Sequence, residues 1–341
     1  MHVCAYEPKY DFFSQCTDVL QTSHAQEWEK EQQQLQRKPS KEQSVHESKR
    51  TTQEIRVGKS RAILKTSKRG GARSKKNRVK KSKSKKNVKF SIMGTNAAGL
   101  KAKKDSLMHN IKLFAFPSVI TIQESKNRTS GTIKLENYQV FEKIRSGFGG
   151  GLLTAVSHNL EPVLIEAVNE ESEILVVQCK IEQSNIRIIN GYGPQEDESL
   201  AKRSAFWQSL EQEISAAKNS NCMILVQMDG NAKLGSEKIS QDPNDMSDNG
   251  RLLWDMIDRE SLVLLNSSIL CTGAITRNRI TKDGEEKSIL DYVLTCERLA
   301  AFLESMHIDE DRNFPLTKYA TTKGIQKIVK SDHNILHAKF A

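Results

Sequence analysis

The sequence predicts an α/β domain over residues 88–341 of the 341-residue chain. Three observations lead to this prediction. Apolar runs of strand length alternate in this region with longer segments of helical spacing, which is typical of α/β folds. Polar side chains recur where the apolar runs stop, and a length of about 250 residues suits one domain.

The predicted strands are short runs rich in apolar and β-branched residues. Segments 174–181 and 186–191 are predicted to pair across residues 182–185, and segment 222–228 is predicted to be a buried strand. The other predicted strands cover residues 88–93, 118–122, 149–156, 262–266, 288–295 and 334–340.

Three longer segments are predicted to be helices. In segment 100–114, Leu107, Ile111 and Phe114 recur at near-helical spacing. Ser199 is a suitable N-cap for a helix over residues 199–218, because its hydroxyl can accept a hydrogen bond from the first turn. The third helix is predicted over residues 248–259.

The net charge of +10 comes from one segment. Residues 56–89 hold 16 Lys and Arg and no Asp or Glu, whereas residues 90–341 hold 29 basic and 33 acidic residues. A tract of this kind repels itself and buries little apolar surface, so we expect residues 56–87 to be disordered. We expect the polar leader, residues 1–55, to be disordered as well.

Three roles remain open for the basic tract. It can neutralise nucleic-acid phosphates, which gives salt-dependent binding to DNA or, through residues 56–89, to RNA. It can be a nuclear-import signal. It can also be a solvated linker without a partner.

Composition excludes several classes of protein. The longest apolar stretches, 174–177 and 262–265, are much shorter than the roughly 18 residues of a membrane span, so we expect no membrane partner. Six scattered cysteines without a CxxC pair favour neither a disulfide framework nor a zinc site, and they indicate a reducing compartment. The N-terminal residues do not have the pattern of a signal peptide, so we expect a protein that is not secreted.

Polar and charged side chains gather at the ends of the predicted strands. A single carboxylate at a strand end is usually a cap or a solvated turn, so only its recurrence is informative. The set is Asn96, Glu124, Asn190, Tyr192, Asp229, Asn231, Asp291, Ser331, Asp332 and His333.

Seven motifs occur in order along this region. They are TNAAGL (95–100), QES (123–125), GGGLLTAV (149–156), NGYGP (190–194), MDGNAKLG (228–235), SILDYVL (288–294) and SDHNILHAKF (331–340). The ordered series resembles the endonuclease/exonuclease/phosphatase superfamily over residues 88–341. DNGRLLWDMIDRESLVLLNS (248–267) and the pair Thr276 and Arg277 resemble its apurinic-type branch, in particular the endonuclease domains of non-LTR (LINE-type) retrotransposons.

The resemblance implies a four-layer α/β sandwich, in which two packed mixed β-sheets are flanked by helices and the active site lies at one end of the sheets. It also implies Mg²⁺-dependent hydrolysis of a phosphodiester, with Mn²⁺ as an alternative metal. Glu124 would be the main metal ligand, with Asp332 beside the metal site. Tyr192 would donate a hydrogen bond to a phosphate oxygen.

The same resemblance assigns five residues to the reaction itself. Asp229 would position or deprotonate the attacking water, Asn231 would contact the phosphate, and Asn96 would orient the carboxylate. His333 would contact the scissile phosphate, with Asp291 holding its tautomer. Elementary electrostatics agrees with the last pair, because a carboxylate beside a histidine favours the protonated ring.

Two positions depart from the pattern of the family. Ala98 stands where many relatives have Asp or Asn, which removes one outer contact near the metal. Met228 stands where the family usually has the glycine of a Gly-Asp pair. Neither change removes a central residue, so we expect activity.

The leading interpretation is a DNA endonuclease that nicks one strand and leaves a 3′-hydroxyl, which a retrotransposon uses to prime reverse transcription. An abasic-site DNA repair endonuclease is the alternative within the superfamily. A non-catalytic nucleic-acid-binding protein with a decayed nuclease fold is the alternative from another class. We expect a nuclear protein, with the cytoplasm as second choice, and the sequence indicates no oligomeric state.

Overall fold

The computed structural model describes residues 90–145, 147, 149–322 and 325–341. The predicted leader (1–55) and basic tract (56–87) lie outside these residues and stay predictions. The described residues fall within the predicted domain of residues 88–341, whose bounds also stay a prediction.

Two large mixed sheets form the frame of the domain. The seven-stranded sheet contains β1 (Phe90–Asn96), β2 (Val119–Gln123), β3 (Tyr138–Lys143), β4 (Leu152–Ser157), β10 (Cys271–Thr272), β14 (Leu303–Ile308) and β17 (Leu336–Phe340), in the order β10-β14-β17-β1-β2-β4-β3. The six-stranded sheet contains β5 (Val163–Ile165), β6 (Ile174–Ile181), β7 (Ser184–Tyr192), β8 (Met223–Asp229), β9 (Val263–Leu264) and β13 (Asp291–Thr295), in the order β5-β6-β7-β8-β13-β9. The parallel pairs are β1 with β2, β7 with β8, and β10 with β14.

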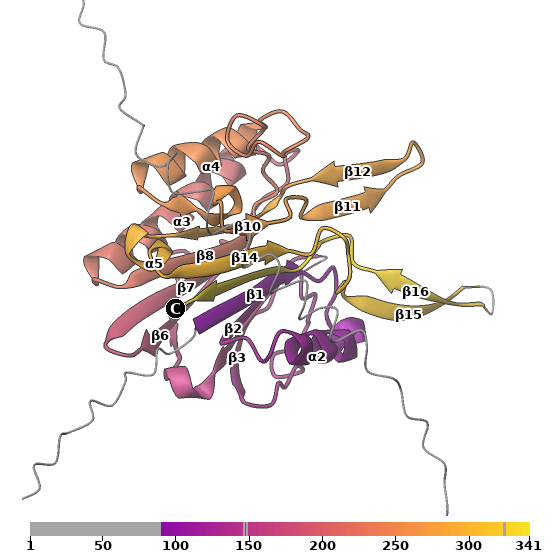
Figure 1. Cartoon of the computed structure of the whole chain (residues 1–341), viewed down its shortest axis with the longest axis horizontal. Helices are drawn as coiled ribbons and strands as arrows, with labels where there is room; N and C mark the ends of the chain where they lie inside the picture. The colour runs from indigo at the N-terminus through magenta and orange to yellow at the C-terminus, as the bar shows by residue number, and fades with distance from the viewer. Residues whose placement is uncertain (1–89, 146, 148, 323–324) are drawn as a thin grey trace, which may run out of the picture. The chain divides into compact units, whose positions relative to one another are not determined.

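The two sheets pack face to face and helices cover their outer faces. One buried cluster joins Ile92 of β1 to Ile188 of β7 and Leu225 of β8, so the inner faces of the sheets meet. Other clusters pack α3 (Leu200–Asn219) and α4 (Asp248–Arg259) against one sheet and α2 (Lys104–Leu113) against the other. Figure 1 shows α2 on one side of the sheets and α3 with α4 on the opposite side. The predicted four-layer α/β sandwich is therefore confirmed.

Coverage on both faces explains why the central strands are apolar without alternation. Every residue of β8, MILVQMD, is buried, which agrees with the strand predicted over 222–228. A sheet with one solvent-exposed face would instead show polar residues at every second position of its strands.

The helices follow the predictions closely. Ser199 caps α3, and its hydroxyl accepts a hydrogen bond from Lys202 N at 3.3 Å. The helix predicted over 100–114 begins with a 3₁₀ turn, η1 (Lys101–Lys103), in which Lys103 N donates to Leu100 O at 2.8 Å. Shorter helical turns are η2 (His158–Leu160), η3 (Leu265–Ser267) and α5 (Glu297–Ala300). Within the described residues, no helix has both the length and the apolar character that a membrane span requires.

The strand predicted over 262–266 is wrong in its second half. Within this segment only the two residues of β9 pair with β13, and the chain then turns into η3. The Asn266 side chain replaces backbone pairing here, because its Nδ2 donates to Asp291 O and its Oδ1 accepts from Val293 N, both at 3.0 Å. The apolar run in the sequence does not reveal that a side chain takes the place of backbone pairing here.

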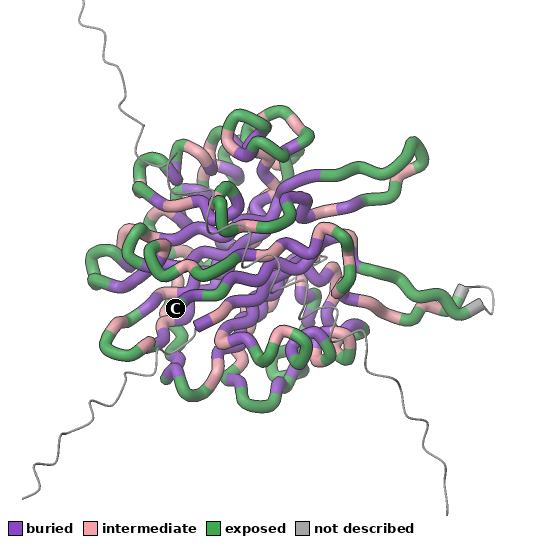
Figure 2. The backbone as a smooth tube through the Cα atoms, viewed as in Figure 1, coloured by how far each residue is buried: buried purple, intermediate pink, exposed green. Residues whose placement is uncertain are grey.

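Two hairpins that the sequence did not predict leave the sandwich. β11 (Arg277–Ile280) pairs with β12 (Glu285–Ser288), and β15 (Thr317–Thr322) pairs with β16 (Ile325–Lys330). Figure 1 shows both hairpins leaving the domain on the same side, and Figure 2 shows that most of their described residues are exposed. The strand predicted over 288–295 is consequently divided between β12 and β13.

A pair of histidines lies on the seven-stranded sheet. His307 of β14 and His337 of β17 are directly opposite one another in the antiparallel register. Burial, together with Lys339 and His307, lowers the pKa of His337 to about 3. The His337 ring packs on Phe114, with 4.8 Å between the ring centroids. The folded protein therefore holds His337 neutral.

We expect acid to destabilise the fold through His337. The ordinary histidine pKa is about 6.5, so between pH 6.5 and pH 3 the unfolded chain binds one more proton than the folded chain, and stability falls as the pH is lowered. The expected loss between pH 7.5 and pH 5 is about 2 kcal/mol for this group. Urea unfolding should be measured at pH 7.5 and pH 5. Between these values the free energy of unfolding of His337→Phe should fall by about 2 kcal/mol less than that of the parent. The exposed His158, changed to Gln, is the control, and an undiminished acid loss in His337→Phe would contradict the prediction.

Candidate active site

Strand pairing brings the predicted site residues to one end of both sheets. Asn96 is the last residue of β1, and Glu124 directly follows the last residue of the parallel neighbour β2. In the second sheet, Asp229 at the end of β8 lies opposite both Tyr192 of β7 and Asp291 of β13. The sequence placed Tyr192 and Asp229 just after the predicted strands. In the structure they are the last residues of β7 and β8.

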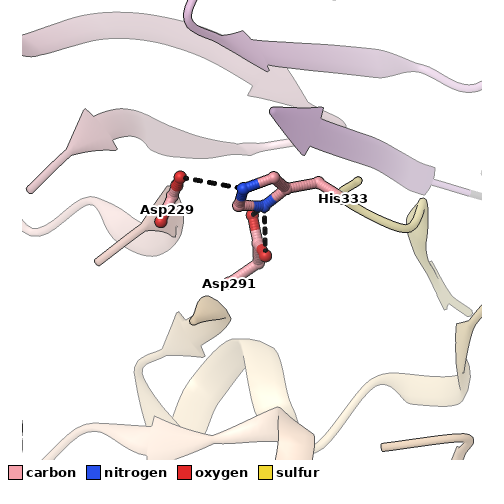
Figure 3. Close-up of side chains that lie close together, drawn as sticks. All are labelled: Asp229, Asp291 and His333. Carbon is pink, nitrogen blue, oxygen red and sulfur yellow. Dashed lines mark hydrogen bonds and ion pairs between the residues drawn. The ribbon is translucent and has the colours of Figure 1, made fainter. Parts of the chain in front are cut away.

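Asp229, Asp291 and His333 form a buried cluster, which Figure 3 shows. His333 Nδ1 lies 2.9 Å from Asp291 Oδ2 and 3.1 Å from Oδ1, and His333 Nε2 lies 3.7 Å from Asp229 Oδ2. The ring therefore lies between two carboxylates from neighbouring strands. The expected contact between Asp291 and His333 is present, and the catalytic role of each residue stays a prediction.

The charges of this cluster are strongly coupled. Burial by itself would lower the pKa of His333, but the carboxylates of Asp291 and Asp229 raise it to about 9. Burial and the nearby Asp291 carboxylate raise the pKa of Asp229 to about 7, although His333 opposes this shift. At neutral pH the imidazolium form of His333 is favoured, because two buried carboxylates face it.

Glu124 is surrounded by hydrogen-bond donors. Its Oε1 accepts a hydrogen bond from the Tyr192 hydroxyl at 2.7 Å, and its Oε2 lies 2.6 Å from Lys126 Nζ. Burial would raise the pKa of Glu124, but the hydrogen bonds from Lys126, Tyr192 and Asn96 lower it below its usual value. The carboxylate is therefore ionised at neutral pH.

Asn96 joins the two halves of the site. Its Nδ2 donates to Asp229 Oδ2 at 2.7 Å and to Glu124 Oε1 at 3.3 Å. Its Oδ1 accepts a hydrogen bond from Ala98 N at 2.8 Å, which fixes the orientation of the amide. Ser331 Oγ also donates to Asn96 O at 3.0 Å. Residues from both sheets thus converge on one site.

Three residues of this site have a strained backbone. Ala98, Glu124 and Asn231 each have a φ of 45°, in the left-handed region that few residues other than glycine adopt. Such conformations cost about 1–3 kcal/mol each and persist where the surroundings hold them. Asn231 is held on both sides, because its N donates to Asp229 Oδ1 at 3.1 Å and its Nδ2 donates to Gly193 O at 2.9 Å.

A buried polar network ties the sheets together behind the site. Gln123 Nε2 donates to Asn190 Oδ1 at 2.7 Å and to Gln227 Oε1 at 2.8 Å. Asn190 Nδ2 in turn donates to Leu153 O at 3.0 Å. These bonds join β2 and β4 of one sheet to β7 and β8 of the other. Asn190 therefore has a structural role that explains its place in the NGYGP motif.

Asp332 lies beside this group of residues, and its side chain is bonded elsewhere. Arg277 Nε donates to Asp332 Oδ2 at 3.0 Å. Burial would raise the pKa of Asp332, but His333 and Arg277 lower it below its usual range. Among the described residues, no hydrogen bond or ion pair joins Asp332 to Glu124, so the two predicted metal ligands share no direct contact.

Lys126 and Arg277 are site residues that the sequence did not single out for this role. Each pairs with one predicted metal ligand. Lys126 follows Glu124 by two residues, and this spacing was an available signal. Arg277 is 55 residues from Asp332, so only the folded chain shows this pair.

Searches with the sequence find neither a matching family model nor a matching curated protein. Solved structures do match. The endonuclease domain of TRAS1, a telomere-specific non-LTR retrotransposon, is 16% identical, covers 74% of this chain and 98% of its own, and has a TM-score of 0.55. The AP endonuclease LMAP from Leishmania major is 14% identical, with coverage of 74% and 87% and a TM-score of 0.58. The chain has the endonuclease/exonuclease/phosphatase-type fold.

Another solved structure with this endonuclease/exonuclease/phosphatase-type fold is described as an exonuclease. It is the 3′-5′ exonuclease NExo from Neisseria meningitidis, which is 14% identical, covers 74% of this chain and 99% of its own, and has a TM-score of 0.55. At these identities the likeness concerns the fold, and activity has to be argued from the site.

Within this endonuclease/exonuclease/phosphatase-type fold, Glu124 has the chemistry to hold a divalent cation. The Lys126 ammonium already lies 2.6 Å from its Oε2, so a positive charge fits there. Carboxylate oxygens also suit Mg²⁺, which takes one or two carboxylates and keeps several waters. Asp332, with Arg277 as its present cationic partner, offers a second carboxylate.

The cluster of Asp229, Asp291 and His333 suits a metal less well. One ligand atom from each residue lies within 4.8 Å of the others. A histidine must be neutral to bind a metal, whereas the two carboxylates raise the pKa of His333 to about 9. The imidazolium thus supplies the positive charge of this cluster, and Glu124 is the better candidate for the cation.

Proposed function

We propose that this protein is a divalent-metal-dependent phosphodiesterase that nicks one strand of duplex DNA and leaves a 3′-hydroxyl, as a retrotransposon-type endonuclease acting in the nucleus. The observation that carries the proposal is the Asn96 amide, which reaches Glu124 and Asp229 together. It joins a cation-binding carboxylate to a buried Asp-His-Asp cluster. The similarity to the TRAS1 endonuclease domain supports DNA as the substrate.

The site meets the needs of phosphodiester hydrolysis. A phosphodiester is anionic, so the site has to supply positive charge and a base for the attacking water. Mg²⁺ or Mn²⁺ held by Glu124 and Asp332 would act as a Lewis acid on the phosphate. Asp229, whose pKa is raised to about 7, is suited to accept a proton from the water near neutral pH.

The other residues position and neutralise the phosphate. His333 would donate from Nε2 to a phosphate oxygen, because its Nδ1 donates to Asp291. Burial and Glu124 raise the pKa of Tyr192, so its hydroxyl stays protonated and can donate to a phosphate oxygen. Asn231 cannot titrate, so it can contact the phosphate without competing for the proton.

Incubation of the full chain with supercoiled plasmid tests this proposal. With Mg²⁺ we expect nicked circles whose ends a DNA polymerase can extend, because extension requires a 3′-hydroxyl. Removal of the metal with EDTA should stop the reaction, and Mn²⁺ should restore it. Absence of nicking with either metal would favour a non-catalytic nucleic-acid-binding protein, and ends that resist extension would contradict the proposed product.

An abasic-site repair endonuclease is the second candidate. AP endonucleases from Leishmania major and Archaeoglobus fulgidus share the fold, which favours this activity. Intact duplex, duplex with one abasic site, and RNA should be compared side by side. Similar rates on the two duplexes support the leading proposal, whereas cleavage confined to the abasic site supports the repair enzyme.

A further inference from the structure

The β15–β16 hairpin exposes apolar side chains, and none of its described residues belongs to a buried apolar cluster of the domain. Tyr319 is 72% exposed, and Ile328 is 62% exposed. A two-stranded hairpin is marginally stable in water by itself, and exposed apolar groups that lie together usually mark a binding surface. The hairpin therefore has the character of an element that binds a partner.

The strand register separates the side chains of the hairpin by face. Tyr319 lies directly opposite Ile328, so these two apolar side chains share one face. Lys330 lies on that same face, at the end of β16 that joins the sandwich. Lys318 and Lys327 lie on the other face. Each face thus carries positive charge, and one face carries an aromatic-aliphatic pair.

The charge of the hairpin differs from that of the domain. Residues 316–330 contain no Asp or Glu, whereas residues 90–341 as a whole hold 29 basic and 33 acidic residues. The sandwich is thus slightly acidic and this hairpin is basic. A local basic element on an acidic domain is suited to an anionic partner.

The hairpin is continuous with the candidate active site. Ser331 N donates to Leu316 O at 2.7 Å and closes the base of the hairpin. Ser331 Oγ then donates to Asn96 O, and His333 follows two residues later. A phosphate that contacts His333 would therefore lie close to the base of the hairpin.

We propose that β15–β16 is a DNA-binding arm that lies in a groove of the duplex beside the cleaved phosphate. Tyr319 and Ile328 contact sugars and bases there, and Lys318, Lys327 and Lys330 contact phosphates. The major groove admits a two-stranded β-ribbon. Strands of 6 residues are about 20 Å long, which corresponds to roughly six base pairs. This inference rests on the proposed function, because it takes duplex DNA as the substrate.

The first test separates substrate binding from chemistry. Tyr319→Thr combined with Ile328→Thr keeps residues that favour strands and removes the apolar pair. We expect KM for nicking of an intact duplex to rise about tenfold, since burial of two large apolar side chains against the duplex contributes this much or more. Hydrolysis of bis(p-nitrophenyl) phosphate, a phosphodiester too small to reach the arm, should be unchanged. Ile269→Thr, at another exposed isoleucine, is the matched control.

The second test measures the phosphate contacts. Fluorescence anisotropy of a labelled duplex in EDTA gives the dissociation constant of the full chain at several salt concentrations. Changing Lys318, Lys327 and Lys330 to Gln should reduce the slope of log affinity against log salt by about 2 to 3, because each lost phosphate contact removes about 0.9. Lys180→Gln, at the end of β6 away from Tyr192, is the matched control and should keep the slope.

The outcomes distinguish the arm from the proposed function. If the parent chain cleaves neither substrate, the proposed function fails, and the anisotropy measurements still test the arm. If the variant with Tyr319→Thr and Ile328→Thr loses equal activity on the duplex and on bis(p-nitrophenyl) phosphate, the hairpin only supports the fold. That result overturns the inference. Unchanged duplex binding in both arm variants also overturns it, and a simultaneous change in sedimentation would assign the hairpin to a protein partner.

Discussion

His333→Ala is expected to lower the rate of plasmid nicking by about 10³-fold, while DNA binding persists. The imidazolium lies between Asp291 and Asp229, so among the described residues it is the cationic group paired with the proposed base. Its removal leaves two buried carboxylates facing each other, which would repel both the phosphate and the attacking hydroxide. The measurement is the initial rate of nicking in Mg²⁺ beside a DNA-binding titration.

Two further variants show which property of the histidine matters. His333→Gln keeps a donor of similar size without the charge, and it guards against unfolding of the alanine variant. Asp291→Asn keeps the shape but no longer favours a proton on Nδ1 of His333, so we expect a loss of comparable order. The exposed His158→Ala should nick like the parent. Full nicking activity in either folded His333 variant would remove this residue from the mechanism.

The layers of the fold were predictable from the sequence because burial has a simple signature. β8 is covered on both faces, so its residues 223–226 form a continuous apolar run that can be recognised in the sequence. The start of helix α3 was predictable from its capping residue, Ser199. In both cases local sequence and global packing favour the same structure.

The hairpins escaped prediction because they are stabilised by contacts that leave no periodic pattern. β12 has the sequence EEKS and β15 has TKYATT, and neither alternates between apolar and polar residues over its length. Arg277 begins β11 and is bound to Asp332, so a tertiary ion pair helps to fix the base of that hairpin. The sequence around Arg277 or around Asp332 does not predict this contact, because the two residues are 55 positions apart.

The members of the site were predictable from ordered motifs, but their connections were not. The sequence led us to Glu124, Asp229 and His333 one motif at a time. It did not show that the Asn96 amide would bridge Glu124 and Asp229, which are separated by more than a hundred residues. Strand register determines that bridge, and a shift of one residue would turn Asn96 to the other face of β1.

Gly193→Ala is expected to disrupt both stability and nicking. A Cβ at this position would lie 2.3 Å from Gly230 O and 2.7 Å from Gly230 C, so the clash is with backbone that cannot rotate away. Overpacking of this kind costs about 3 kcal/mol. A domain of this size should then melt roughly 6–12 °C lower. Thermal unfolding followed by circular dichroism measures this directly.

The effect should extend to activity because Gly193 is bonded to the site. Its N donates to Asp229 O at 2.7 Å, and its O accepts a hydrogen bond from Asn231 Nδ2 at 2.9 Å. Moving this loop outward would displace Asp229 from the water that it is proposed to activate. Misplacement by about 1 Å can cost roughly a hundredfold in rate.

Gly191→Ala is the matched control for this prediction, two residues away in the same motif. A Cβ at Gly191 would meet only side chains, with Met228 Cβ at 3.3 Å and Phe206 at 3.7 Å. The overlap is relieved by a movement of a few tenths of an ångström, much less than Gly193→Ala requires, so we expect a smaller loss of stability and a nicking rate close to that of the parent. If both glycine variants melt and nick alike, the close approach of Gly193 to Gly230 does not hold the site together.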